Sequence, residues 1–265
     1  MQPLLNIAIN AARQAGDIIV RNLELLDRVK ISSKDGDEYF SEVDIKAEQA
    51  IIKTLLKAHP EHGIIAEESG VYNAEAESVW IIDPLDGTTN FLHGFPFYSV
   101  SIALKVKHRI EHAVVLDPLR YECFSASRGR GALLNDRRIR VSNQLKLHDS
   151  LLTSNLSLRN NTIASRHLPI LEALSGNCRG IRCTGSAALD LVYTACGRAD
   201  AFWQFGLKPW DIAAASLIIR EAGGLISDMQ GEEKYLQNGN VVAGTPKIFK
   251  SLLQTITLAN KGSLK

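Results

Sequence analysis

Residues 80–91 read WIIDPLDGTTNF, an apolar run that ends in a turn carrying two carboxylates. The apolar run predicts a buried strand, because short runs rich in β-branched and aromatic residues before turn residues are typical of strands. Pro84 removes a backbone donor, and Asp86-Gly87 is common turn chemistry, so the strand should end in a rigid corner. We therefore expect Asp83 and Asp86 on one side of this corner, with Thr88 at the start of a short helix.

An ordinary Asp-Gly turn is the alternative for this stretch, and for the dipeptide alone it is the commoner interpretation. The whole string after a strand favours a phosphate site instead. Gly87 lets a phosphate approach the backbone closely, and the N–H groups of Gly87 and Thr88 would point at it from a helix start.

Three further carboxylates belong to two other short segments. Glu67 and Glu68 end the apolar run GIIAEES, and Asp211 stands in KPWDIAAAS at a predicted helix start. Neighbours on an extended strand point to opposite faces, so only one of the two glutamates can face a site, and we choose Glu67. A solvated strand end for the glutamates and a helix cap for Asp211 are the alternatives.

Together these acidic residues predict a cation site. Isolated buried anions are costly, and like charges at close range resist joint ionisation. Hard divalent cations relieve both costs. Magnesium fits best, because the donors are all oxygen and no His or Cys stands at metal-ligand spacing around them. The sequence therefore points to metal-assisted chemistry on an anionic substrate.

The composition is that of a globular protein with free thiols. The chain has 265 residues, of which 45% are hydrophobic and 22% charged, enough for a sizeable core. A net charge of +1 argues against a surface that binds nucleic acid or an anionic membrane through bulk charge. The four cysteines form no C-x-x-C pair, which indicates a reducing compartment, and we expect the cytoplasm. The N-terminal stretch MQPLLNIAINAARQAG reads as an amphipathic helix, not as a signal or membrane-spanning segment.

Helical and strand patterns mix along the chain without strict alternation. Residues 4–26 have helical spacing, and a second helix should start near Ser41 and stop before Pro60. Ser41 and Asp44 form a capping box, in which Asp44 could serve only its own backbone. From Ser99 to Val141 the pattern predicts an antiparallel sheet with strands at SIALKVK, AVVLDPL, ECFSAS and RRIRV. Further helices are expected near 163–175, from Asp211 to Ala222 and after Pro246, and further strands at ADAFWQF and VVAGT.

These patterns predict layers of helix and sheet. No linker, internal repeat or composition shift divides residues 1–265. We therefore expect one structural unit over residues 1–265, which could consist of two lobes of about 1–145 and 146–265.

Four motifs carry a resemblance to a known family. WIIDPLDGTTNF (80–91), WDIAAASLIIREAGG (210–224), EES (67–69) and GSAALDL (185–191) occur in the order typical of the inositol monophosphatase family. That family belongs to a wider group that includes fructose-1,6-bisphosphatases, and the similarity runs nearly end to end. The resemblance implies an α/β layered fold, the α-β-α-β-α sandwich of the inositol monophosphatase and fructose-1,6-bisphosphatase type, paired as a homodimer.

The resemblance also implies a reaction. Family members are phosphoric monoester hydrolases whose activity depends on Mg²⁺ and is inhibited by lithium, and inositol 1-phosphate is the expected substrate. Two to three Mg²⁺ ions per site are expected, with Glu67, Asp83, the Leu85 carbonyl, Asp86 and Asp211 as metal ligands. Thr88 would orient the attacking water and Asp44 would accept its proton, with Glu67 as the third catalytic residue.

The substrate side is assigned in the same way. Gly185, Ser186 and Ala187 match the segment that touches the sugar-like part of the substrate, although a helix N-cap is the alternative for Ser186. Arg182 is a candidate substrate or dimer contact. Gln204 stands where inositol-binding members usually have a glutamate, which puts the preference for inositol 1-phosphate in doubt. The predicted substrate-binding residues are Leu85, Asp86, Gly87, Thr88, Arg182, Gly185, Ser186, Ala187, Gln204 and Asp211.

Two other functions compete with this one. A phosphatase for a sugar bisphosphate or a nucleotide phosphate would keep the chemistry and change the substrate. The resemblance is closest to the bacterial housekeeping form, one of whose members also acts in ribosomal-RNA transcription antitermination. A transcription-complex partner with secondary catalysis is therefore the alternative from another functional class.

Overall fold

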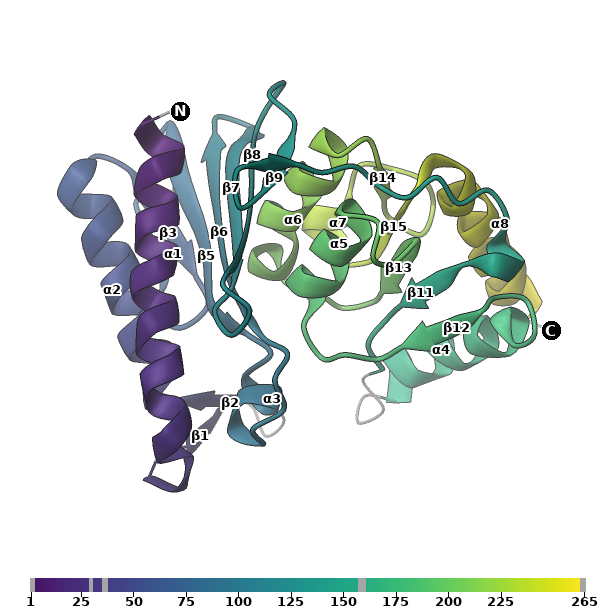
Figure 1. The fold of residues 1–265 in the computed structure, drawn as a ribbon, viewed down its shortest axis with the longest axis horizontal. Coiled ribbons are helices and arrows are strands. Elements are labelled where there is room, and N and C mark those ends of the chain that lie inside the picture. Colours follow the sequence, from purple (N-terminus) through teal and green to yellow (C-terminus); the bar gives the residue numbers. More distant parts are fainter. Residues whose placement is uncertain (1–2, 29–30, 35–37, 157–160, 263–265) are drawn as a thin grey trace.

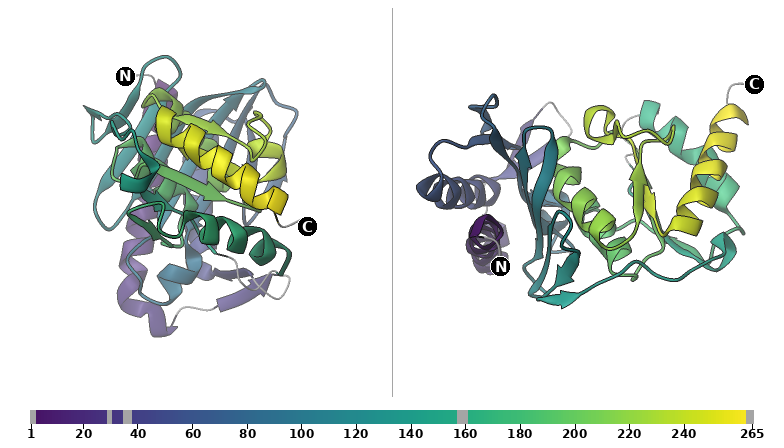
Figure 2. Two further views of the ribbon diagram at one scale, coloured as in Figure 1. Left: turned by 90° about the vertical axis from the view of Figure 1, so that its right-hand side faces the viewer. Right: turned by 90° about the horizontal axis from the view of Figure 1, so that it is seen from above.

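The computed structural model describes residues 3–28, 31–34, 38–156 and 161–262. Two sheets alternate with three layers of helices, in the order helix, sheet, helix, sheet, helix (Figure 1). Figure 2 shows these layers from above, with the N-terminal and C-terminal helices in opposite outer layers. The predicted α-β-α-β-α sandwich is confirmed.

The first sheet has eight strands in the order β10-β9-β8-β7-β6-β5-β3-β4. β3 and β5 run parallel, so the residues that follow β3 lie beside the end of β5. The other neighbouring pairs of this sheet are antiparallel, as the sequence predicts for its middle strands. The strands are β3 Gly63–Ala66, β4 Gly70–Tyr72, β5 Ser78–Asp86, β6 Ser99–Val106, β7 Arg109–Asp117, β8 Glu122–Ser127, β9 Ala132–Leu134 and β10 Arg137–Arg138.

Two amphipathic helices cover the outer face of this sheet, α1 (Pro3–Asn22) and α2 (Glu42–Ala58). The predicted capping box is present at the start of α2. Trp80 and Ile82 of β5 pack into the same apolar cluster as these helices, whereas Ile81 packs into the cluster on the other face. Because successive side chains alternate, β5 is buried on both faces.

The second sheet has five strands in the order β12-β11-β13-β15-β14. Its strands are β11 Leu151–Thr153, β12 Gly180–Arg182, β13 Ala201–Gln204, β14 Leu225–Ser227 and β15 Val241–Gly244. α4 (Asn161–Leu174) and α8 (Pro246–Gly262) lie outside it, as Figure 1 shows. α5 (Ala187–Ala195) and α6 (Pro209–Glu221) fill the layer between the two sheets.

Shorter elements complete the chain. β1 pairs with β2 as a two-stranded sheet, and α3 follows β5. These elements are η1 Leu23–Arg28, β1 Ile31–Lys34, β2 Glu38–Ser41, α3 Thr88–Leu92, η2 Leu147–Asp149 and α7 Tyr235–Asn238.

Some element predictions are wrong in detail. The first α-helix ends at Asn22 and continues as a 3₁₀ segment with a non-helical residue, Leu25 (φ −116°). The stretch RRIRV forms only the two-residue strand β10, whereas β9, which was not predicted, precedes it. β12 and β14 were also not predicted, because three-residue strands are too short to show a period. No helix of the described residues has the length and apolar composition needed to cross a membrane.

Candidate active site

Four carboxylates from three segments meet where β3 and β5 end. Glu67 directly follows β3, Asp83 and Asp86 lie in the last part of β5, and Asp211 lies in the first turn of α6. We call these four residues the acidic cluster. The sequence therefore identified the segments that meet here.

Backbone pairing brings the segments together. The Glu67 N–H donates to a carbonyl of β5 at 3.2 Å, which places Glu67 beside Asp83. Asp83 pairs with Ser101 of β6, and the Ser101 hydroxyl donates to the carbonyl of Trp210 at 3.1 Å. This bond ties the start of α6 to the sheet, so that Asp211 lies near the end of β5.

A bulge in β5 explains why Asp83 and Asp86 share one side. On a regular strand, residues three positions apart point to opposite faces. The pairing of β5 with β6 shifts between these two aspartates, which pair with Ser101 and Ser99. Pro84 lies inside the shift and has no N–H for the ladder. The extra residue turns Asp86 toward Asp83.

Burial and mutual repulsion raise the pKa values in the acidic cluster. Asp83 is only 2% exposed. Two causes raise the pKa of Glu67 to about 8: burial is the larger, and the negative charge of Asp211 is the second. Burial is also the largest cause that raises the pKa of Asp83 well above its usual value, and the negative charges of the other three residues add to it. Burial also raises the pKa of Asp86, so the cluster concentrates negative charge in a buried space.

The acidic cluster fits hard cations. Its donors are carboxylate oxygens, and a divalent ion would relieve the repulsion that raises their pKa values. Among the described residues, three candidate ligand atoms lie within 4.8 Å of one another only at His59, Glu61 and His62. No three residues of the acidic cluster bring carboxylate oxygens this close together, so its side chains would have to move toward a shared ion to bind it.

Mg²⁺ should stabilise the protein more at high pH than at neutral pH. The raised pKa of Glu67 means that, without metal, its stabilising contribution is complete below pH 4.5 and is lost as the pH rises to about 8. Mg²⁺ bound at the acidic cluster would favour the ionised form and reverse that loss. We expect the melting temperature in EDTA to fall from pH 7 to 8.5 and the gain from Mg²⁺ to grow. In Glu67→Gln both changes should shrink, and equal changes in variant and wild type would contradict this account.

Thr88 and Asp44 form a hydrogen-bonded pair beside the acidic cluster. The Thr88 hydroxyl lies 2.9 Å from Asp44 Oδ1 and 3.0 Å from the Leu85 carbonyl, so its single proton can go to either acceptor. Asp44 is fully buried, and its Oδ2 accepts from the N–H and the hydroxyl of Ser41. Burial raises the pKa of Asp44. Asp44 thus serves both the capping box and Thr88, and the interpretation that it serves only its own backbone is wrong.

The start of α5 binds Asp86. The Ser186 hydroxyl donates to Asp86 Oδ2 at 2.5 Å, and the N–H groups of Ala187 and Ala188 donate to the same carboxylate at 3.3 and 2.8 Å. Ser186 also caps α5, as its alternative interpretation states. Ser186 and Ala187 therefore position a cluster carboxylate from the layer between the sheets. Their contact with a substrate stays a prediction.

Two turns in the left-handed backbone region approach each other closely. Gly87 has φ +101°, and a Cβ there would lie 3.1 Å from the Phe97 carbonyl and 3.2 Å from the Gly185 carbonyl. Gly185 has φ +92°, and a Cβ there would lie 2.6 Å from Asn90 Nδ2. Asn90 donates from that amide to the carbonyls of Phe97 and Thr184. Only glycine fits at positions 87 and 185 without displacing these groups.

Asn155 connects the predicted substrate side to the second sheet. Its Oδ1 accepts from the Gly185 N–H at 2.6 Å, which fixes the orientation of its amide because a backbone N–H can only donate. Its Nδ2 then donates to Gln204 Oε1 at 3.2 Å and faces Asp190 Oδ2 at 3.4 Å. Gln204 consequently turns its oxygen toward Asn155. Its Nε2, a donor, is the atom left for other partners.

Arg182 does not join the site. It lies exposed at the end of β12, and its guanidinium donates to the carbonyl of Ile181 at 3.2 Å. Asp211 does join it, although its Oδ2 also accepts from the Lys208 N–H at 2.8 Å as a helix cap. The cap interpretation and the cluster interpretation of Asp211 are thus compatible.

Glu48 is a site residue that the sequence analysis missed. It is 2% exposed, and its carboxylate accepts from the N–H groups of Glu68 and Ser69 at 2.8 and 2.7 Å. Both bonds fix the segment that carries Glu67. A glutamate four residues after Asp44, on the buried stripe of the same helix, was the available signal, because such residues share a helix face.

Glu48→Gln is expected to weaken Mg²⁺ binding about tenfold, as loss of a residue that orients a metal ligand typically does. The amide can accept from one of the two N–H groups but presents a donor to the other, so the Glu67 segment loosens. Titration calorimetry with Mg²⁺ measures the change. Glu75→Gln, an exposed glutamate, is the matched control. An unchanged Mg²⁺ affinity in Glu48→Gln would contradict the assigned positioning role.

Comparisons with known proteins agree with this architecture. The profile described as "Inositol monophosphatase family" matches residues 1–260. "Nus factor SuhB" of Pseudomonas aeruginosa is 52% identical over 270 residues, covering 100% of both chains. The protein of the same name from Escherichia coli K12 is 46% identical over 254 residues, covering 96% of this chain and 95% of its own.

Solved structures show the same fold. The "extragenic suppressor protein suhB" of Bartonella henselae has a TM-score of 0.94 at 39% identity, covering 96% of this chain and 98% of its own. The inositol monophosphatase from Anabaena has a TM-score of 0.83 at 32% identity, covering 96% and 95%. The family and the fold type that the motifs indicate are both confirmed.

Proposed function

This chain belongs to the inositol monophosphatase family, and from that premise we propose that its acidic cluster binds Mg²⁺ and hydrolyses a small phosphate monoester. The observation that carries the proposal is the meeting of four carboxylates beside the Thr88 hydroxyl, which is hydrogen-bonded to Asp44. Inositol 1-phosphate is the first substrate to test. A sugar bisphosphate or nucleotide phosphate is the alternative within the same chemistry.

Glu67, Asp83, the Leu85 carbonyl, Asp86 and Asp211 would bind the ions. When bound, Mg²⁺ supplies charge for the phosphate oxygens and lowers the pKa of a nearby water. The chain's own contribution is positioning. Asp86 is oriented by three donors at the start of α5, from Ser186, Ala187 and Ala188. Glu67 is oriented by the segment that Glu48 fixes, so little reorganisation is needed when the phosphate reacts.

Thr88 and Asp44 would manage the proton of the attacking water. If the Thr88 hydroxyl donates to Asp44, its lone pairs remain free to accept from a water on the phosphate side. Burial raises the pKa of Asp44, and a carboxylate with a raised pKa is a better general base, because it binds a proton more readily. Water would attack phosphorus as the P–O bond to the substrate breaks, and the leaving alkoxide would take a proton from solvent water to become the alcohol. This direct attack needs no covalent phosphoenzyme.

Phosphate release from inositol 1-phosphate, measured with Mg²⁺ and with EDTA, tests the proposed reaction. The proposal expects release only with Mg²⁺. Equal release under both conditions, or release from no monoester in a panel of polyol, sugar and nucleotide phosphates, would reject it. The homodimer, the sensitivity to lithium and the cytoplasmic location remain predictions from the resemblance.

Gln204→Glu should raise kcat/KM for inositol 1-phosphate relative to a less hydroxylated substrate such as glycerol phosphate. In the wild type Gln204 turns its oxygen to Asn155 and offers a donor, whereas a polyol hydroxyl is better bound by a carboxylate acceptor. One added charge-assisted hydrogen bond corresponds to a gain of about tenfold. Gln254→Glu, an exposed glutamine on α8, is the control. An unchanged ratio of the two specificity constants would show that Gln204 does not select the substrate.

A second function rests on the names of the relatives. Proteins 46–52% identical to this chain over nearly their full length are named Nus factors. These names support a role in a transcription complex more directly than they support any one phosphate ester. We propose that the chain also binds transcription elongation factors, through a surface independent of catalysis.

A pull-down with wild type and Asp83→Asn tests this second function. Binding of elongation factors by both proteins is the expected result. Loss of binding in the variant alone would make the two functions dependent on each other. Failure of both to bind any elongation factor would reject the transcription role and leave the proposed hydrolase untouched.

A further inference from the structure

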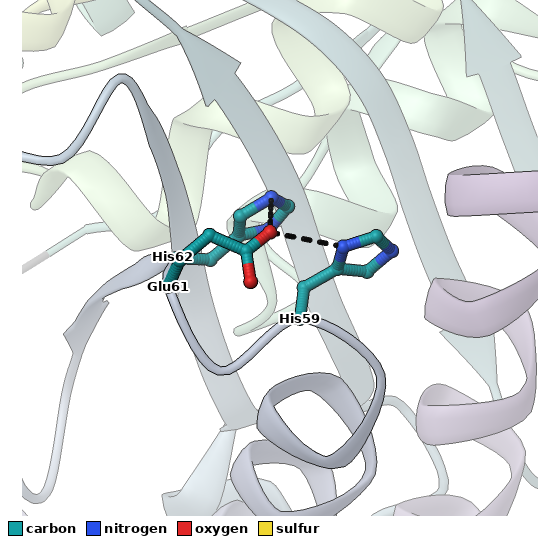
Figure 3. Close-up of side chains that lie close together, drawn as sticks. All are labelled: His59, Glu61 and His62. Carbon is teal, nitrogen blue, oxygen red and sulfur yellow. Dashed lines mark hydrogen bonds and ion pairs between the residues drawn. The ribbon is translucent and has the colours of Figure 1, made fainter.

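Two histidines and a glutamate meet in the turn between α2 and β3. The His62 N–H donates to the His59 carbonyl at 3.2 Å, and Pro60 restricts the backbone between them. Figure 3 shows the result, with one oxygen of the Glu61 carboxylate facing a nitrogen of each ring. His62 is buried and packs against Trp80, with ring centroids 5.9 Å apart, whereas His59 is partly exposed. The turn thus presents three potential ligands from one short, ordered segment.

The spacing of these ligand atoms suits a transition metal. His59 Nδ1 lies 3.2 Å and His62 Nε2 lies 3.4 Å from Glu61 Oε1. In a tetrahedral zinc site with bonds of about 2.0–2.1 Å, neighbouring ligand atoms are about 3.3–3.4 Å apart. The two nitrogens are farther from each other, within 4.8 Å, because the rings stack with centroids 4.6 Å apart. A rotation of the partly exposed His59 side chain would bring its nitrogen closer to the His62 nitrogen, to the spacing that a tetrahedral site requires.

We propose that His59, Glu61 and His62 bind one transition-metal ion of the Zn²⁺ type, with its fourth position open to water. Two imidazole nitrogens and one carboxylate oxygen are donors typical of zinc sites. The acidic cluster, in contrast, offers only oxygen. The two sites lie at opposite ends of β3, since His62 precedes its first residue and Glu67 follows its last. The site is therefore separate from the proposed hydrolase chemistry and does not depend on it.

A bound ion would connect the C-terminal end of α2 to the start of β3. Binding to the folded chain alone stabilises it by mass action. Zn²⁺ should therefore raise the melting temperature through this site even when Mg²⁺ saturates the acidic cluster.

Co²⁺ titration of the untagged full-length protein in saturating Mg²⁺ tests the proposal. A tetrahedral site with nitrogen ligands gives intense visible absorption, whereas octahedral oxygen sites absorb weakly. We expect intense bands that saturate at one Co²⁺ ion per chain and disappear when Zn²⁺ replaces Co²⁺. His59→Asn and Glu61→Gln should abolish the bands while leaving circular dichroism and the Mg²⁺-dependent activity unchanged. His62 is left intact because its ring is part of the packing against Trp80.

His148→Asn is the matched control. His148 Nδ1 lies 3.3 Å from Asp149 Oδ1, so the pair offers a histidine and a carboxylate in exposed positions without the stacked second ring. This variant should keep the bands. Only weak octahedral bands in the wild type, or intense bands that persist in His59→Asn, would overturn the proposal.

Discussion

Asp83→Asn is expected to lower phosphate release by about 10³-fold or more, because loss of one preorganised electrostatic contact alone costs about 10²- to 10³-fold. In the proposed site Asp83 contributes to more than one such contact, because it would bind both ions, and the charges of Glu67, Asp86 and Asp211 all raise its pKa. The Leu85 N–H donates a hydrogen bond to Asp83 Oδ1 at 2.9 Å. Asparagine has the same size as aspartate and keeps a side-chain oxygen that can accept this bond. Steady-state assays with saturating Mg²⁺ measure the loss.

A folding defect must be separated from this catalytic loss. Removing one of several repelling buried charges should leave the metal-free protein as stable as wild type or more stable, as its melting temperature in EDTA would show. Mg²⁺ should stabilise the variant less than the wild type. Asp17→Asn, an exposed aspartate on α1, is the control and should retain full activity. Near wild-type activity in Asp83→Asn would reject the shared-ion site.

Thr88→Val is expected to lower kcat by about 10²- to 10⁴-fold, the range that positioned proton transfer typically contributes. Valine has the shape of threonine without the hydroxyl, so the bond to Asp44 Oδ1 and the orientation of the water are both lost. Mg²⁺ affinity should stay close to that of the wild type, because the side chain is not a metal ligand in this account. Rate measurements together with calorimetry separate the two effects.

Thr88→Ser tests the same assignment in the opposite direction. Serine keeps the hydroxyl and should retain most of the rate. If Ser and Val variants lose the same amount, packing and not the hydroxyl is responsible, and the role assigned to Thr88 and Asp44 is wrong.

The long, strongly patterned elements could be predicted from the sequence. The helical stripe and capping box of α2 and the apolar run of β5 give their elements nearly to the residue. The three-residue strands could not be predicted, because β12 and β14 exist through pairing with β11 and β15 and not through a pattern of their own. The end of α1 was missed because its apolar spacing continues past the kink at Leu25.

The acidic segments could be predicted because their carboxylates stand at strand and helix ends. What the sequence could not show is how these residues are oriented. Ser186 binds Asp86 across 100 positions of sequence, and Asn155 reaches Gln204 across 49. Such pairings depend on how the middle helices pack between the sheets. The dual roles of Asp44 and Asp211, as cap and as site residue, also require the tertiary contacts.

The proposed reaction and the proposed transcription role rest on different observations. The geometry of the acidic cluster supports hydrolysis, whereas the names of relatives support the transcription role. The Asp83→Asn variant separates the two, because it changes a buried carboxylate that is proposed to bind both ions and leaves the exposed surface unchanged.

Anomalous scattering from a crystal grown with Mn²⁺ in place of Mg²⁺ tests the central claim most directly. The account predicts at least two peaks about 4 Å apart, as in two-metal sites, with an Asp83 oxygen bound to both and Glu67, Asp86 and Asp211 around them. A map with no peak at the acidic cluster, or with a single ion that Asp83 does not touch, would contradict it.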